Sequence, residues 1–379
     1  MRRSLVMMFR RPVMWMSVFG LPLFLFLFIG SMLNKGLPTR LPATIVDLDG
    51  TGMSRQITQQ LGAMQMVDLK YVANSYSEAR RQMQKGEIYG YFLIPENFQA
   101  DLLSGRGPEI SFYTNMTYYV PGTLLFKTFK TTAVYTKAGT AAELARDLGQ
   151  NPAELAPMMQ PVNIHAHAIG NPLLNYGIYL GNSFIPGVLQ LMIMLVTVFT
   201  LGEEIKRNTS RQMLRQAGNS IFRAMFCKIF PQTVIWWCVA LFMTAWLFKF
   251  NGYTMQGSWF WLIMSELLFV VATQAFAVFV FGILPNMRLA LSVCALTGIL
   301  SFSIAAFSFP EQSMYPAVSI FSWLMPVRYN FLIYSDVALN GRDIFYSRFW
   351  FVAYLAYMLL PLVVMPRIKQ HMARPVYLE

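Results

Sequence analysis

The stretch VMWMSVFGLPLFLFLFIGSML, residues 13–33, decides the class of this fold. It contains no charged side chain over 21 residues. At about 1.5 Å of rise per residue, a helix of this length crosses a hydrocarbon core about 30 Å thick. Its apolar run is longer than that of a signal peptide, and no small-residue cleavage pattern follows it. We therefore interpret it as a retained membrane span.

The rest of the chain repeats this character. Of its 379 residues, 55% are hydrophobic and only 13% are charged, which indicates a surface that faces lipid. Five more stretches qualify as spans two to six: 182–202, 229–248, 259–284, 289–309 and 349–366. The sequence therefore predicts a polytopic α-helical membrane protein with six transmembrane helices, divided into 1–35 with the first span, an insert at 36–178, and 179–379 with the other five.

The distribution of charge predicts the orientation of these spans. The formal net charge is +12, and the segments before span one, between spans two and three, between four and five, and after six are all basic. The insert at 36–175 balances 11 basic against 11 acidic residues, and the segment 310–348 balances three against three. Because short basic loops stay in the cytoplasm, both termini are expected inside and the insert outside. The positive charge then indicates anionic lipid headgroups and argues against nucleic acid as a partner.

The insert alternates strand-like and helix-like segments. The strand-like runs are ATIVDL, VDLKYV, YGYFLIP and EISFYTN, separated by helix-like stretches, with a long helix expected at about 123–148 and a last short strand at VNIHAHAIG. Such alternation predicts an extracytoplasmic α/β domain with mostly parallel strands. His165 and His167 in the last strand have the spacing of two metal ligands, but no third ligand can be named, and a polar strand face explains them as well.

The segment TIVDLDGTGMSR, residues 44–55, resembles the start of a phosphohydrolase, in which Asp47 would be the nucleophile. Such enzymes need a later acidic pair to hold Mg²⁺ beside the first aspartates, and no such pair follows Asp49 in the insert. The alternative is a strand end and a tight turn, in which aspartates cap the backbone and glycines allow positive φ. We favour the turn.

The loop between spans two and three, LGEEIKRNTSRQMLRQAGNSIFRAMFCK, is basic and has helical spacing. It is either a helix that lies on lipid headgroups or a docking surface for a cytoplasmic partner, which we place at 203–228. Glutamates at the end of a helix oppose its dipole, so their presence favours an external cationic partner. The candidate docking residues are Glu203, Glu204, Arg207, Thr209, Arg211 and Arg215.

Polar side chains within spans are expensive in lipid and therefore mark candidate functional positions. The candidates for a transport path are Asn182, Ser183, Gln190, Glu266 and Gln274. For Glu266, a contact with substrate or with another helix and a snorkelling or water-exposed carboxylate explain the position equally well.

The segment FSFPEQSMYPAVSIFSWLMPVRYNFLIYSDVALNG follows span five and is apolar, but each of its runs is too short to span. Its regularly spaced prolines predict short re-entrant helices at 310–345, buried against protein before span six. The residues that define this motif are Pro310, Met314, Pro316, Pro326 and Tyr329.

Together these stretches resemble the permease subunits of ABC-2 type exporters, in particular the drug-exporter-like branch with a large outer domain. The resemblance is carried by the opening RRPVMWMSVFGLPLFLFLFIG, the insert, the stretch LGEEIKRNTSRQML and the stretch FPEQSMYPAVSIFSWLMPVRY. One departure is Asn208-Thr209, where the family usually has glycine before the threonine. Another is that only about a dozen residues precede the first span.

The chain contains no G-x-x-x-x-G-K-[ST] motif, so it is expected to be a transporter subunit without ATPase activity of its own. The resemblance implies an ATP-binding subunit as partner, which carries ATP and Mg²⁺, so no cofactor is expected on this chain. It also implies a second permease, in a homo- or heterodimer, outward transport across a bacterial inner membrane, and tilting of spans one, two and five when the ATPase closes. A periplasmic adaptor and an outer-membrane channel are further candidate partners. The alternatives are a membrane-anchored scaffold whose outer domain recruits periplasmic partners, or a phosphohydrolase using Asp47.

Overall fold

The structure, a computed structural model, describes residues 12–33, 38–147 without 105 and 107, and 176–375 without 251, 252, 254, 306 and 308–310. The chain divides into two compact units, a helical one formed by 1–36 and 167–379, and an α/β one formed by 37–166. Pro310, both histidines of the predicted last strand and the basic residues of the first segment lie outside the described residues.

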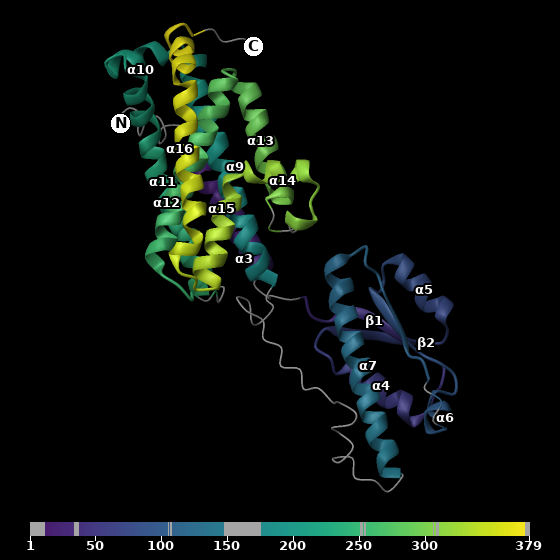
Figure 1. Ribbon diagram of the computed structural model, residues 1–379. Coiled ribbons are helices and arrows are strands. Elements are labelled where there is room, and N and C mark those ends of the chain that lie inside the picture. The colour runs from purple at the N-terminus through teal and green to yellow at the C-terminus, as the bar shows by residue number, and fades with distance from the viewer. Residues whose placement is uncertain are drawn as a thin grey trace. The chain divides into compact units, whose positions relative to one another are not determined.

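The helical unit is a bundle of long helices (Figure 1). Among the described residues, five are long and apolar enough to cross a membrane. They are α9 (Tyr176–Lys206), α11 (Ile221–Phe250), α12 (Trp259–Ile283), α13 (Met287–Ile304) and α16 (Ile344–Ala373). Predicted spans two, three and six lie within α9, α11 and α16, α12 contains all of span four except residue 284, and α13 contains residues 289–304 of span five. This confirms the predicted class of a polytopic helical protein.

The predicted first span is helical but irregular. It consists of α2 (Pro12–Trp15), the π-helix η1 (Met16–Gly20) and α3 (Leu21–Leu33). Pro22 explains the wide turn, because it has no N–H to donate to the carbonyl of Val18, and its ring crowds that carbonyl. The N–H of Leu21 instead donates to the carbonyl of Met16, five residues back. The apolar helix measured here, Met16–Phe28, is shorter than the other five, and a count of six spans stays a prediction.

Glycines let the long helices approach closely. A Cβ atom added to Gly298 of α13 would lie 2.5 Å from Leu191 of α9, and one added to Gly282 of α12 would lie 2.5 Å from Val364 of α16. Small residues at helix contacts are the usual packing device in lipid, where no hydrophobic effect holds helices together. α12 packs against α9, α11 and α16 and is therefore central to the bundle.

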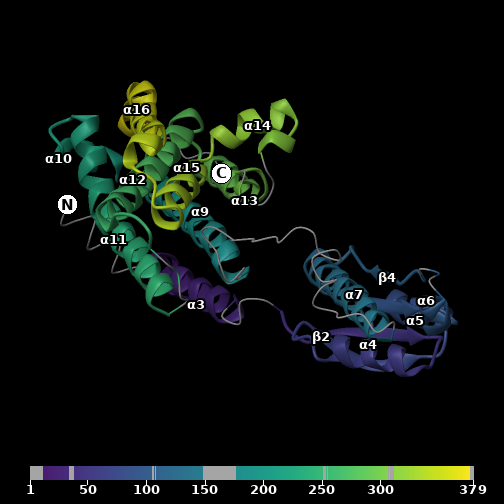
Figure 2. The ribbon, with the colours of Figure 1, turned by 60° about the horizontal axis from the view of Figure 1, so that its bottom comes forward.

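Short helical segments follow α13. The first is the 3-10 turn η2 (Glu311–Ser313), and after it come α14 (Pro316–Trp323), α15 (Pro326–Ile333) and the π-helix η3 (Tyr334–Leu339). Pro316 and Pro326 begin α14 and α15, a position where the missing N–H costs nothing. The prolines therefore start short helices as predicted. Figure 2 shows α15 inside the bundle and α14 projecting from it.

The α/β unit contains a four-stranded sheet in the order β2-β1-β3-β4. The strands are β1 (Leu41–Asp47), β2 (Val67–Ala73), β3 (Gly90–Ile94) and β4 (Ser111–Thr114). β1 pairs in parallel with β2 and β3, and only β4 is antiparallel, in agreement with the predicted alternation.

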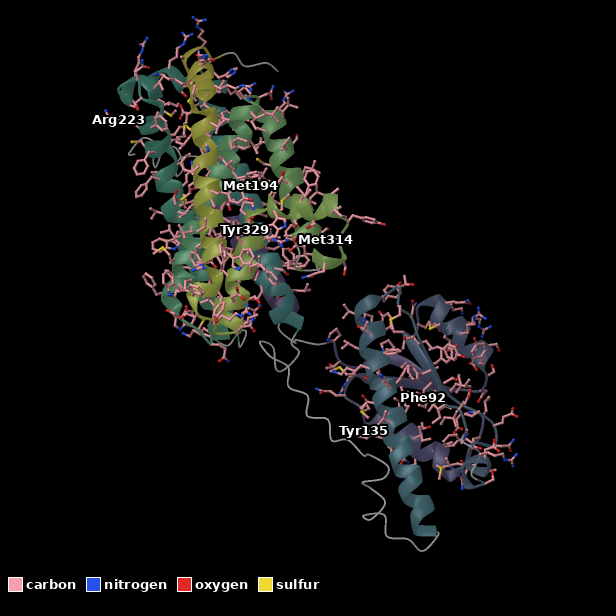
Figure 3. All side chains as sticks on the ribbon, in the orientation of Figure 1. Phe92, Tyr135, Met194, Arg223, Met314 and Tyr329 are labelled. Atoms are coloured by element: carbon pink, nitrogen blue, oxygen red, sulfur yellow. The ribbon has the colours of Figure 1, made fainter. Side chains whose placement is uncertain are left out.

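Helices cover both faces of this sheet. The core on one face joins β1 and β3 to α4 (Gly52–Gly62), α6 (Phe98–Leu103) and α7 (Tyr119–Asp147). The smaller core on the other face involves α5 (Tyr76–Lys85). Phe92 of β3 is fully buried in the larger core (Figure 3), so each face of the central strands is protected from water.

The aspartates that resemble a phosphohydrolase site hold a turn. Asp47 Oδ1 accepts hydrogen bonds from the N–H groups of Asp49 (3.1 Å) and Gly50 (3.0 Å), and Asp47 Oδ2 accepts one from the Ser54 hydroxyl (2.7 Å). Asp49 accepts hydrogen bonds from the Thr51 hydroxyl and the Gln99 N–H. Gly50 has φ of 63°, which a tight turn requires. Both carboxylates therefore accept hydrogen bonds from N–H groups and hydroxyls of this chain, which supports the turn interpretation.

Gly257 provides a test of the packing between the loop before α12 and η3. A Cβ atom at this position would lie 2.2 Å from the carbonyl oxygen of Val337, which cannot rotate away. We expect Gly257→Ala to destabilise the chain by about 1–3 kcal/mol and to lower its thermal midpoint in detergent. Gly52→Ala is the matched control, because nothing lies within 4 Å of that Cβ position. Equal midpoints for both variants would contradict the close approach.

Candidate functional site

The predicted docking segment 203–228 consists of the last turn of α9, the short helix α10 (Ser210–Gln216) and the first turns of α11. Asn208, between α9 and α10, has φ of 57°. Asparagine is the residue that best replaces glycine in this left-handed region. Asn208 can therefore adopt the left-handed backbone that glycine favours. α10 lies across the end of the bundle, as Figures 1 and 3 show.

Glu204 has a cationic partner inside the chain. Its Oε1 lies 2.6 Å from Nζ of Lys228 on α11, and its Oε2 accepts a hydrogen bond of 2.6 Å from the Thr209 hydroxyl. Both members of the ion pair are buried. The expectation that Glu204 awaits an external cation is therefore wrong, because a carboxylate removed from water needs its counter-charge close by. Lys228 is not among the docking residues selected from the sequence, although it lies at the end of the same segment.

α10 is also tied to the end of α16. The Ser210 hydroxyl donates to the carbonyl of Met372, and Arg211 Nε donates to the carbonyl of Ala373, both at 2.9 Å. These carbonyls belong to the last turn of α16 and have no acceptor role within the helix. Arg211 thus acts as a cap in addition to being exposed.

The remaining docking candidates lie at the surface. Arg207 pairs with Glu203 at 3.1 Å across one helical turn and remains 58% exposed. Arg215 is exposed on α10, while Met213 and Leu214 are buried beneath the same helix. α10 is therefore an amphipathic helix whose exposed face is basic. The polar side chains of α10 bond to α16, and the Thr209 hydroxyl directly before α10 bonds to Glu204 of α9, whose ion pair reaches α11. These three long helices are predicted spans two, three and six.

The resemblance implies that spans one, two and five tilt when the ATPase closes, whereas the contacts around α10 involve spans two, three and six. Of span one, Met14 lines a cavity of about 20 Å³ beside Glu203, Glu204 and Lys228, but no residue of α13 lines it. Among the described residues, the polar side chains of α10 bond to α16 and not to α13, because the end of α16 lies next to α10.

The five candidates for a transport path are all buried within this chain. Gln190 accepts a hydrogen bond of 2.7 Å from the N–H of Val327 and donates one of 3.3 Å to the Ser301 hydroxyl. Gln274 accepts one of 2.6 Å from Thr233, and the Ser183 hydroxyl donates to the carbonyl of Leu180. The hydrogen bonds of Gln190 and Gln274 join different helices, whereas that of Ser183 lies within α9. The assignment of these five residues to a transport path stays a prediction.

A second polar network lies around α14 and α15. Arg328 is 3% exposed, pairs with Glu311 and donates a 2.5 Å hydrogen bond to the Ser322 hydroxyl. Its guanidinium carbon lies 4.3 Å from the centre of the Trp323 ring. Neither Arg328 nor Glu311 was singled out from the sequence, although a lone arginine in an apolar stretch is itself a signal that a partner must exist.

The predicted motif residue Tyr329 belongs to this network (Figure 3). Its hydroxyl donates to the carbonyl of Trp323 at 2.8 Å, as does the hydroxyl of Tyr357 on α16 at 3.0 Å. This carbonyl lies at the end of α14, where helical acceptors lack partners. Met314, by contrast, is half-buried beside α14 (Figure 3).

Glu311 lies outside the long apolar helices and is charged at neutral pH. Burial acts to raise the pKa of its carboxyl, but the hydrogen bonds from Arg328, Ser319 and Trp323 outweigh that effect and lower the pKa. The short helices are therefore held by an ion pair that stays intact over the physiological range of pH.

The buried pair of Glu204 and Lys228 makes a testable contribution to stability. Lys228→Met removes the cation and leaves the carboxylate unpaired, which costs about 3–5 kcal/mol. In the double variant Glu204→Gln/Lys228→Met neither charge remains, and we expect most of this loss to be recovered. Thermal unfolding of the purified chain and both single variants completes the cycle. Additive effects of the two changes would contradict a coupled pair.

Comparison with known proteins identifies the family of this chain. The linearmycin resistance permease protein LnrN of Bacillus subtilis (strain 168) is 30% identical over 150 residues, which are 37% of this chain and 38% of that protein. The match thus covers well under half the length of this relative. A family model described as "ABC-2 family transporter protein" matches residues 12–365. Because that match covers nearly the whole chain, this multi-pass membrane protein belongs to the ABC-2 family of transporter proteins.

Proposed function

We propose that this chain is the permease of an ATP-driven exporter and moves its substrate outward across a bacterial inner membrane. Family membership supports a role as the transmembrane subunit of an ABC transporter. ATP is then hydrolysed by a separate subunit, and a second permease of the same or a similar kind completes the path.

The observation that carries this proposal is the attachment of α10. Arg207, in the turn before α10, and Arg215 of α10 are both exposed and available to a partner. The Thr209 hydroxyl, directly before α10, bonds to Glu204 of α9, which pairs with Lys228 of α11, and Ser210 bonds to α16. A short helix held in this way moves only if the long helices beneath it move. It can therefore transmit a displacement at the inner surface to three predicted spans.

A basic surface suits a partner with an acidic groove. Exposed arginines contribute little to the stability of this chain, because surface ion pairs are worth about 0–1 kcal/mol. They are available to steer and orient a partner, since charge complementarity chiefly raises association rates and specificity. We infer that the partner is the ATP-binding subunit and that closure of its dimer pushes on α10.

An apolar groove supports a hydrophobic or amphipathic substrate. It has a volume of about 450 Å³ and lies between the first helical segment, α9 and α13. Its lining includes Leu21, Met192, Phe199 and Leu291. Grooves of about 300–1,000 Å³ with apolar walls are typical of small-molecule sites. The relative named for linearmycin resistance supports export of a harmful compound of this kind.

The location of the α/β unit and its further partners are inferred from the sequence pattern. The balanced charge of the insert supports an extracytoplasmic position for the α/β unit. From there it can contact a periplasmic adaptor or an outer-membrane channel, and a scaffold without transport uses the same surface. Measured transport distinguishes the exporter from the scaffold.

The test reverses charge on α10 and on the turn before it without changing Thr209, Ser210 or Arg211. In Arg207→Glu/Arg215→Glu, we expect the ATP-binding subunit to be lost on co-purification and substrate-stimulated ATP hydrolysis to be abolished. Only one surface ion pair, with Glu203, is lost, so the thermal midpoint of the permease should shift little.

Arg288→Glu is the matched control, because Arg288 is exposed at the start of α13 in another predicted inner loop. It should retain the partner and the stimulated hydrolysis. Normal coupling in the α10 double variant, or equal loss in the control, would argue against α10 as the docking helix.

A further inference from the structure

Glu266 lies in a small polar cavity inside the bundle. The cavity has a volume of about 20 Å³ and is lined by residues of α9, α11, α12, α15 and η3. Its polar members are Asn182, Thr244, Glu266, Asn330 and Tyr334. Room of about 10–15 Å³ is enough for one water molecule, so the cavity also accommodates one small ion without its hydration shell.

The charge of Glu266 is not matched within this cavity. The side chain is 5% exposed, and its neighbours are neutral: the Thr244 hydroxyl lies 3.4 Å from Oε1, and Asn330 provides a second hydrogen bond. The lining contains no lysine, arginine or histidine. A buried carboxylate without a counter-charge costs several kcal/mol, which contrasts with the ion pairs made by Glu204 and Glu311 in the same unit.

Asn182 adds oxygen atoms that also lack donors. Its side-chain Oδ1 is buried and has no hydrogen-bond partner among the described residues. Pro186 follows four residues later in α9 and has no N–H, so the main-chain carbonyl of Asn182 receives no helical hydrogen bond from it. Asn182 and Pro186 both line the cavity.

We propose that Glu266 and Asn182 form the core of a binding site for one small monovalent cation of the sodium class. A carboxylate, an amide oxygen, a freed carbonyl and a hydroxyl are all hard oxygen ligands, the type that binds such cations in interrupted membrane helices. One carboxylate matches a single positive charge, whereas calcium takes six to eight oxygens and commonly several carboxylates. The bound ion holds α9, α11 and α12 together from inside.

The probe is sodium chloride, compared with choline chloride at equal ionic strength, on the purified full-length chain. We expect sodium to raise the thermal midpoint saturably and radioactive sodium to bind once per chain. Ligand that binds the folded state alone stabilises it in this concentration-dependent way.

Three variants distinguish sodium binding in this cavity from general effects of salt on the protein. Glu266→Gln keeps the size of the side chain but removes the charge, and should abolish both sodium binding and the shift in midpoint. Pro186→Ala restores an N–H for the carbonyl of Asn182 without changing any charge, and should weaken sodium binding by about tenfold or less, the equivalent of one lost ligand. Glu87→Gln, which removes an exposed carboxylate of the α/β unit, should leave binding unchanged.

Undiminished sodium binding in Glu266→Gln would overturn the proposal. So would an absence of sodium binding by the wild-type chain together with an infrared band of a protonated carboxyl group that disappears in Glu266→Gln, because a proton would then neutralise the site. These measurements need neither an ATPase nor a transported compound, so their result is independent of the proposed export function.

Discussion

Hydrocarbon offers no hydrogen bonds, and this constraint accounts for most of the polar contacts in the helical unit. A polar group that enters the bundle must find its partner within the chain. Gln190 satisfies the N–H of Val327 at the start of α15, and two tyrosine hydroxyls satisfy the Trp323 carbonyl at the end of α14. The short helices can therefore lie against the long ones, because side chains of the bundle bond to backbone groups at their ends that have no partner within the helix.

The same constraint explains the different treatment of three glutamates. Glu204 and Glu311 each have a basic partner, and in both cases the partner comes from a different helix. The ion pairs thus connect helices at specific points, which apolar packing alone does not do. Glu266 has only neutral neighbours in its cavity. A small cation bound there supplies the counter-charge that the other two glutamates receive from a basic side chain.

Prolines direct the backbone at several of these places. Pro22 produces the π-turn of the first helix, while Pro316 and Pro326 begin the short helices. Pro186 leaves a carbonyl without its donor beside Glu266. In each case the missing N–H has a local consequence that follows from the covalent structure. The positions of these prolines are visible in the sequence. Which residues lie beside the backbone group that each proline leaves unpaired depends on the neighbouring helices.

The sequence by itself determined the apolar spans, the balance of charge, the alternation of strands and helices, and the ABC-2 resemblance. These features are properties of continuous segments, so a window of residues is enough to reveal them. Only the tertiary structure decided which polar groups meet. Lys228 reaches Glu204 over 24 residues, and Val327 reaches Gln190 over 137. The partner of a buried polar group depends on which helices lie side by side, a property that no local pattern encodes. For that reason Glu204 could be selected as a candidate from the sequence, while its role as an internal anchor of α10 could not.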